Sequence, residues 1–130
     1  MITIASILLC CQSVDTKEAK LLATWNAVCW VESKGDPKAH NKDENAVGIG
    51  QIRPIMVREC NRIKNRPAFT LADRWCPVKS YEMFRTHSLH YWPDGGPEQW
   101  ARGWNGGPNG MKKSATKTYW NKVKAQMKGE

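Results

Sequence analysis

The stretch TKEAKLLATWNAVCWVES, residues 16–33, decides the fold predicted for this chain. Four of its side chains recur at intervals of four, three and four residues: Leu21, Trp25, Val28 and Glu32. Residues at these intervals share one face of an α-helix. The sequence therefore predicts a helix from Thr16 to Ser33, which Gly35 and Pro37 terminate.

The rest of the chain divides into further helices at its prolines and glycines. Pro54 and Pro77 each suit the first turn of a helix, because that position needs no backbone N–H. A short helix around Glu98–Arg102 and a last helix from about Ser114 to Met127 follow, whereas residues 36–51 form a loop with room for a small hairpin. No convincing run of alternating strand residues occurs, so the predicted fold class is mainly α.

The length of 130 residues suits one domain, and a hydrophobic content of 41% is typical of a globular chain. We place this domain at residues 16–130, behind an apolar N-terminal segment, residues 1–15. That segment is too short to span a bilayer, and it lacks a basic start and a clear cleavage site. It is interpreted as a first helix or as a weak export signal. No transmembrane segment is predicted, and a monomer is expected.

The chain is basic, with 20 lysines and arginines against 12 acids and a net charge of +8. Such a surface favours a polyanionic partner, either a nucleic acid or the bacterial wall with its acidic polymers and peptide carboxylates. The basic residues are scattered, apart from a concentration after Met111, so a specific nucleic-acid partner is not predicted. Seven tryptophans offer flat faces for core packing, and we expect two or three of them to line a sugar-binding groove.

Five cysteines do not make a disulfide framework here, because their number is odd and their spacing irregular. Cys29 lies on the helical stripe and is expected to be a packed thiol. The sequence leaves open a Cys60–Cys76 bridge, and also a zinc site that His87 and His90 would complete. The spacing of these four residues is not a standard finger pattern, so neither a metal nor an organic cofactor is predicted.

Glu32 is the position that indicates chemistry. It lies on the apolar stripe of its helix and in the last turn, where the helix dipole disfavours a further negative charge. Burial and the dipole both favour the neutral carboxylic acid at pH 7. A neutral acid can donate a proton to the leaving oxygen of a glycosidic bond. The alternative is a glutamate at a frayed helix end that is turned to water.

Further motifs follow Glu32 and Ser33 along the chain. They are Gly-Ile-Gly-Gln-Ile-Arg-Pro at residues 48–54, Trp-Asn-Gly-Gly-Pro at residues 104–108, and Tyr119. In this order and at these separations, the set resembles the SLT lytic transglycosylase family of the lysozyme-like superfamily, which is related to the goose-type lysozymes. The resemblance covers nearly the whole chain. It implies a mainly α, lysozyme-like single domain with short helices and a small loop or hairpin region beside an active-site groove.

The resemblance implies roles for single residues. Glu32 matches the family's single catalytic glutamate, and Ser33 completes its Glu-Ser pair. Gln51 matches a glutamine in the floor of the sugar groove, and Asn41 lies near a position, often serine, that steadies the reacting sugar's N-acetyl group. Tyr119 matches a late tyrosine whose hydroxyl lies near the catalytic glutamate.

Some positions depart from the family pattern or have plainer interpretations. Trp104 and Asn105 match a Tyr-Asn pair, so a hydroxyl is lost there and a larger stacking face is gained. Gly50 replaces a common methionine that touches the sugar. Gln51 could equally support a tight turn, Asn105 could be a turn residue, and Tyr119 could belong to the core.

The activity that the resemblance implies is cleavage of the bond between N-acetylmuramic acid and N-acetylglucosamine in peptidoglycan glycan strands, with 1,6-anhydro ends as the product. Hydrolysis of the same bond is the first alternative, and it needs a second acid, for which Asp43 and Glu44 are candidates. A non-catalytic wall-binding module or a phage structural part is another alternative. The expected place of action is the bacterial wall or periplasm, or the wall reached by a phage product.

Overall fold

A computed structural model describes residues 4–128, with side chains from residue 16 onward. Its elements in chain order are α1 (Ile4–Ser33), β1 (His40–Asn41), β2 (Ala46–Val47), α2 (Pro54–Lys64), the 3₁₀-helix η1 (Leu71–Trp75), α3 (Pro77–Tyr91), α4 (Pro97–Gly106), the 3₁₀-helix η2 (Gly110–Lys112) and α5 (Ser114–Lys128). The predicted fold class, mainly α with a small hairpin, is confirmed. Among the described helices, none combines the length and the apolar character that crossing a membrane requires.

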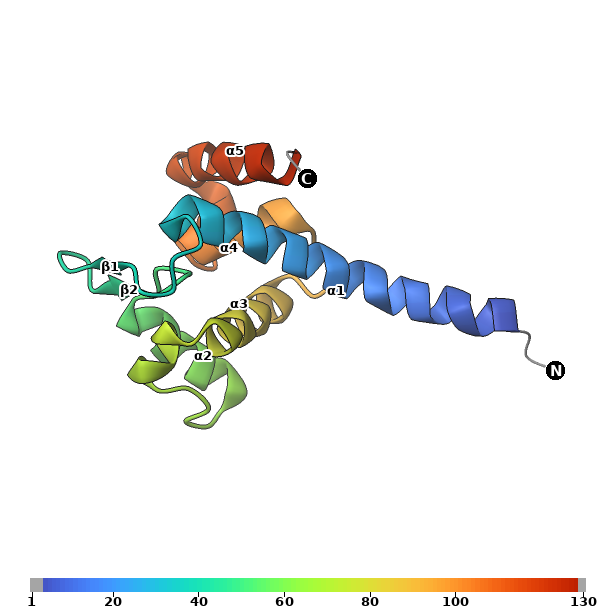
Figure 1. Ribbon diagram of the computed structural model, residues 1–130, viewed down its shortest axis with the longest axis horizontal. Coiled ribbons are helices and arrows are strands. Elements are labelled where there is room, and N and C mark those ends of the chain that lie inside the picture. The colour runs from blue at the N-terminus through green and yellow to red at the C-terminus, as the bar shows by residue number, and fades with distance from the viewer. Residues whose placement is uncertain (1–3, 129–130) are drawn as a thin grey trace.

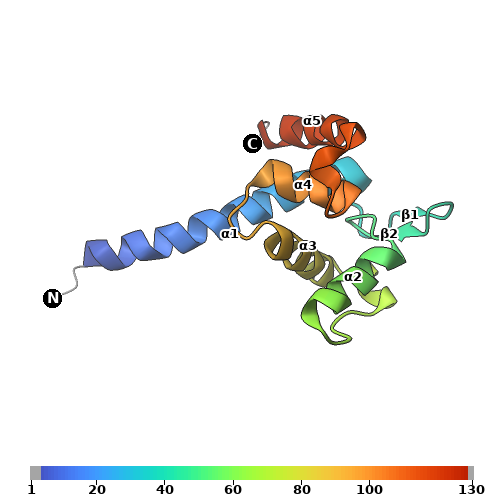
Figure 2. The same ribbon diagram turned by 180° about the vertical axis from the view of Figure 1, so that it is seen from behind.

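The helices are arranged around α1 (Figures 1 and 2). On one side α1 packs against α4 and α5, which also contact each other. On the other side it contacts α3, and α2 covers the far side of α3. The two strands pair antiparallel as a hairpin beyond the C-terminal end of α1. The end of α1 therefore lies where the two groups of helices and the hairpin meet.

Three of the predicted helix starts are confirmed, at Pro54, Pro77 and Ser114. Helix α1 begins before the predicted residue and runs without a break across positions 15 and 16. The division into residues 1–15 and 16–130 stays a prediction, and the side chains of the first part, including Cys10 and Cys11, lie outside the described residues.

The extent of α4 differs from the prediction. The sequence predicts a loop from Trp104 onward, but Trp104 and Asn105 belong to the last turn of the helix, which ends at Gly106. Gly107 then adopts a positive φ of 83°, and its N–H donates to the carbonyl of Gly103 at 2.7 Å. The burial of Trp104 in the core holds this last turn, which overrides the turn propensity of its sequence.

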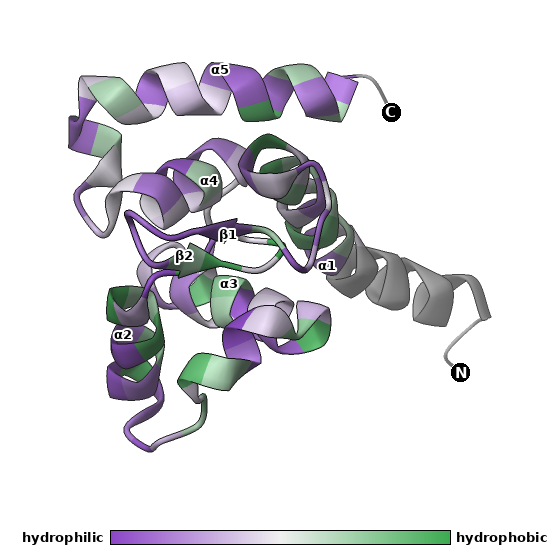
Figure 3. Cartoon of the chain, turned by 60° about the vertical axis from the view of Figure 1, so that its left-hand side comes forward, coloured by the Kyte–Doolittle hydropathy of each residue, from purple (hydrophilic) through white to green (hydrophobic). Residues whose placement is uncertain are grey.

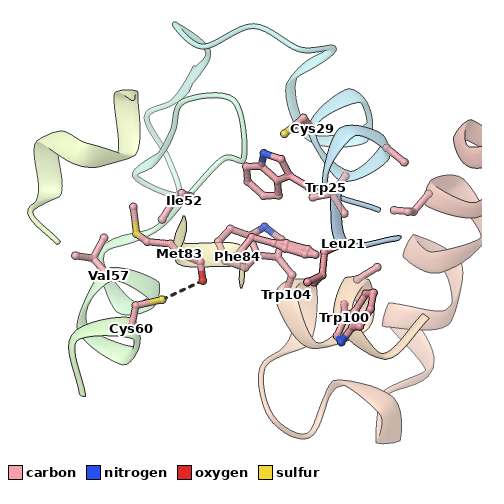
Figure 4. Close-up of a cluster of buried hydrophobic side chains, with 14 of the residues drawn as sticks. Leu21, Trp25, Cys29, Ile52, Val57, Cys60, Met83, Phe84, Trp100 and Trp104 are labelled. Atoms are coloured by element: carbon pink, nitrogen blue, oxygen red, sulfur yellow. Dashed lines mark hydrogen bonds between the residues drawn. The ribbon is translucent and has the colours of Figure 1, made fainter. Parts of the chain in front are cut away.

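An aromatic cluster forms the centre of the core (Figure 4). The ring of Trp25 lies 5.1 Å from that of Phe84 and 5.6 Å from that of Trp104, both in edge-to-face geometry. Phe84 and Trp104 stack at 5.6 Å. Aromatic pairs at these separations add about 0.5–1.5 kcal/mol each beyond the burial of their area. The cluster joins α1, α3 and α4 directly behind the end of α1.

The turn that follows the hairpin is fixed by close approach of the backbone. Gly48 has a φ of 81°, and a Cβ at this position would lie 1.9 Å from the carbonyl oxygen of Arg74. Glycine is therefore required by conformation and by space. Arg74 is buried, and its Nη1 donates to the carbonyls of Asn45 and Ile52 at 2.9 and 3.1 Å. This guanidinium ties η1 to both sides of the turn.

The two strands of the hairpin differ in burial: β1 is exposed and β2 is buried. Figure 3 shows β1 in hydrophilic and β2 in hydrophobic colours. His40 and Asn41 of β1 are exposed, whereas Ala46 and Val47 of β2 are buried. Burial of β2 anchors the hairpin, while the loop between the strands remains at the surface.

Candidate functional site

Glu32 lies in the last turn of α1 and lines a groove of about 830 Å³. Its Oε2 accepts a hydrogen bond from the Tyr119 hydroxyl at 3.1 Å. Burial is the main reason why the pKa of Glu32 rises from its ordinary value to about 7; the hydrogen bond from Tyr119 and the charge of Arg53 oppose this rise, and the charge of Glu44 adds to it. The partial burial that the helical spacing predicts is thus observed, and the interpretation of Glu32 as a frayed, solvated glutamate is wrong. At neutral pH a large fraction of this carboxyl holds a proton.

Tyr119 of α5 is the residue that reaches Glu32 from the other end of the sequence. It is partly buried among the core side chains, and it is not among the residues that line the groove. Burial and the nearby Glu32 raise the pKa of the Tyr119 phenol well above its usual value. The phenol therefore stays protonated and remains a donor to the carboxyl.

A second carboxylate faces the same groove. Glu44 comes from the loop between β1 and β2, and it forms an ion pair with Arg53 at 2.8 Å. Asn41 also lines the groove, and its Oδ1 accepts a hydrogen bond from the backbone N–H of Glu44 at 3.3 Å. Asp43 is exposed and is not part of the groove lining. Of the two acids that the sequence offers, the structure thus places Glu44 with Glu32.

Gln51 lines the groove and also supports the turn beneath it. It has a positive φ of 50°, and its Nε2 donates to the carbonyls of Ala39 and Gly48 at 3.1 and 3.0 Å. Both interpretations of Gln51, groove residue and turn support, therefore apply. Gly50 has no room for a larger side chain, since a Cβ there would lie 2.4 Å from Cη2 of Trp25.

Ser33 holds the end of α1 against this turn rather than lining the groove. Its hydroxyl donates to the carbonyl of Ile49 at 2.8 Å and accepts from the N–H of Asp36 at 3.1 Å. These bonds fix the last turn of the helix, and with it the position of the preceding Glu32. Ser33 is therefore placed as a positioning residue.

The other end of the groove is formed by α4 and the loop after it. Trp104, Asn105 and the following Gly106–Pro108 line it. Trp104 is 7% exposed, so most of its face packs in the core and little is left for stacking on a sugar. The expectation that two or three tryptophans line the groove is wrong, because Trp104 is the one tryptophan of the described chain that does so.

Sequence reasoning missed a polar cluster on the remaining wall. Glu59 and Arg62 of α2, with His87 and Tyr91 of α3, line the groove there. An opposite charge pair at helical i, i+3 spacing was the available signal, but such pairs are common on solvated helix faces. Only the packing of α2 on α3 reveals that this pair lies in the groove.

The cysteine alternatives are also settled for the described residues. Cys29 and Cys60 are buried free thiols, and burial raises the pKa of both, to about 12 for Cys60. The possible bridge is absent, since Cys76 is free as well. As for the zinc alternative, the described part of the chain brings together no group of three histidines, cysteines or acids that could hold a metal ion.

Comparison with known proteins gives one informative similarity. The chain is 29% identical over 111 residues to invertebrate-type lysozyme 6 of Caenorhabditis elegans, which covers 75% of this chain and 80% of that protein. No protein-family model matches the chain, and no solved structure matches it. The similarity is thus to a lysozyme, while the more specific resemblance to SLT lytic transglycosylases stays a prediction.

Proposed function

We propose that this protein is a lysozyme-type enzyme that cleaves the β-1,4 bond between N-acetylmuramic acid and N-acetylglucosamine in peptidoglycan, with Glu32 as its general acid. The observation that carries the proposal is a carboxyl with a pKa of about 7 in the wall of an open groove. The similarity to an invertebrate-type lysozyme supports the class of bond. No metal or organic cofactor enters the proposed reaction.

Protonation of the glycosidic oxygen is the first step. A general acid is most effective when its pKa lies near the working pH, and burial supplies this condition for Glu32. The Tyr119 hydroxyl fixes Oε2 of the carboxyl, so the rotation of the group is restricted. As the bond to the leaving sugar breaks, positive charge develops on the remaining sugar ring, and the ionised Glu32 and Glu44 both lie in the groove to stabilise it.

Hydrolysis is the product route that the geometry favours. A two-carboxylate mechanism needs a second acid beside the sugar, and Glu44 lines the groove close enough to Glu32 for its charge to act on that carboxyl. Asn41 holds the backbone of Glu44, and Arg53 holds its side chain. In this route Glu44 orients or activates the attacking water, or stabilises the charged ring.

A 1,6-anhydro product is the second candidate. The ion pair with Arg53 engages the carboxylate of Glu44. Glu32 then remains as the carboxyl that can first donate a proton and later accept one. In that route the ionised Glu32 accepts the proton of the C6 hydroxyl, which then closes the ring. The contact between Tyr119 and Glu32 matches what the resemblance to lytic transglycosylases implies.

The test is a digest of purified peptidoglycan, with the released fragments identified by mass spectrometry. The native protein, Glu32→Gln, Glu44→Gln and the exposed control Asp43→Asn are compared. We expect reducing-end fragments from the native protein and from Asp43→Asn, none from Glu32→Gln, and a strongly reduced yield from Glu44→Gln.

Anhydro fragments that persist in Glu44→Gln would instead favour the second candidate. Strands that bind to every variant but are never cut would contradict an enzymatic function and leave a wall-binding module.

A further inference from the structure

The cluster on α2 and α3 forms a second polar site in the groove, and the proposed reaction does not use it. Both carboxylate oxygens of Glu59 accept hydrogen bonds from Arg62, at 3.0 Å from Nε and 2.6 Å from Nη2. The Tyr91 hydroxyl donates to Glu59 and accepts from Nη2 of Arg62 at 3.0 Å. Two residues therefore hold the guanidinium of Arg62 in one orientation on the groove wall.

Arg62 keeps binding capacity in this arrangement. A guanidinium carries five N–H donors, and among the described residues Nη1 of Arg62 makes no hydrogen bond. The side chain is 61% exposed, so these donors face solvent. A planar guanidinium with free donors prefers a carboxylate or a phosphate. Because Glu59 and Tyr91 already fix it, a ligand need not immobilise a flexible side chain.

His87 is the buried polar side chain of this cluster. It is 1% exposed and lines the groove beside Tyr91, with the two ring centroids 4.9 Å apart. Neither of its ring nitrogens has a hydrogen-bond partner among the described residues. Burial lowers the pKa of His87 to about 4, so at neutral pH the ring offers one donor and one acceptor. Buried polar groups without partners are rare, and they are expected where a ligand or water completes the site.

The polymer of the proposed reaction offers a fitting anion. Its sugar backbone is built from neutral hydroxyl, ether and acetamido groups, and its carboxylates lie on the branch that each muramic acid carries. This branch is a lactyl group, which is either free or extended by a peptide. Phosphate is absent from this backbone, so among the charged groups of the strand a carboxylate is the partner for Arg62.

We propose that Arg62, held by Glu59 and Tyr91, binds a carboxylate of the muramic-acid branch and makes the groove prefer peptidoglycan to chitin-type chains. This inference rests on the proposed function. Glu59 offsets part of the charge of Arg62, so the preference comes from oriented donors more than from net charge. A charged hydrogen bond at such an exposed position contributes about tenfold in affinity.

The test measures binding of three oligosaccharides to the Glu32→Gln protein, which prevents turnover. The ligands are peptide-bearing muropeptide chains, the same chains after an amidase has removed the peptides, and N-acetylglucosamine oligomers of equal length. The second substitution is Arg62→Ala, and the control is Arg58→Ala, an exposed arginine on α2 outside the groove lining.

We expect Arg62→Ala to lower the preference for a muramic-acid chain over the oligomers about tenfold, and Arg58→Ala to leave this ratio where it is. A loss limited to the peptide-bearing chain identifies the peptide carboxylate as the ligand. A loss limited to the amidase-treated chain identifies the lactyl carboxylate, which is free only there, and a loss on both shows that Arg62 binds either carboxylate. An equal change in affinity for all three ligands, or no change for any of them, would overturn the proposed binding of a carboxylate by Arg62. A parent protein that binds none of the three would instead count against the proposed function itself.

Discussion

Replacing Glu32 by glutamine should stabilise the folded protein at alkaline pH. The pKa of Glu32 rises from an ordinary value of 4.5 to about 7 because the carboxyl is buried. The folded state therefore holds this proton more tightly than the unfolded state, and stability falls as the pH rises from about 4.5 to about 7. The difference of about 2.5 pH units, at about 1.36 kcal/mol each, amounts to about 3 kcal/mol at pH 8. Below pH 4 the contribution of ionisation vanishes, because both states are protonated.

Glutamine is a suitable replacement, since it keeps the shape of the side chain and its oxygen can still accept from Tyr119. Urea unfolding of both proteins at pH 4 and pH 8 gives four free energies of unfolding. The other titrating groups are common to both proteins, so they cancel in the double difference. We expect Glu32→Gln to gain about 3 kcal/mol relative to the native protein between pH 4 and pH 8. An equal difference at both pH values would refute the claim that burial shifts this carboxyl.

Four further substitutions test the site and the turn beside it. Tyr119→Phe removes a hydrogen bond that lowers the pKa of Glu32, so the alkaline limb of the rate profile should move up by about one pH unit; an unmoved limb would show that the bond does not favour the charged form. Gly48→Ala should cost at least about 2 kcal/mol in urea unfolding, because of its positive φ and the Arg74 carbonyl. Gly96→Ala, which meets open space, should cost less than about 1 kcal/mol, and equal losses would contradict the steric argument. Glu44→Gln should lower the rate while leaving the free energy of unfolding within about 0.5 kcal/mol of the native value, whereas an unchanged rate would remove Glu44 from the mechanism.

The sequence predicted the parts of the fold that depend on local patterns. The spacing of three and four residues from Leu21 to Glu32 predicted that the glutamate lies on a packed face, and prolines predicted the starts of α2 and α3. It failed at the end of α4, where burial of Trp104 extends a helix through residues that favour turns. Local propensity does not include such tertiary contacts.

The candidate site was predictable only in part, because its groups are far apart in the chain. The role of Glu32 could be predicted from the pattern of its own helix. Its contact with Tyr119 spans 87 positions, and the prediction of that contact followed from the resemblance alone. The choice of Glu44 over Asp43 depends on how the hairpin loop is turned, which a polar loop sequence does not specify. The cluster of Arg62 needed the packing of α2 against α3, so no local pattern could separate it from a solvated charge pair.

The most direct test of the central claim is the initial rate of peptidoglycan cleavage between pH 4 and pH 9, measured as kcat/KM for the native protein and for Glu32→Gln. If Glu32 is the general acid, the native rate falls tenfold per pH unit above about pH 7, where the carboxyl loses its proton. Glu32→Gln should have no measurable rate across the range. A native profile that stays level from pH 4 to pH 9, or a variant that retains the native rate, would contradict the assignment of Glu32.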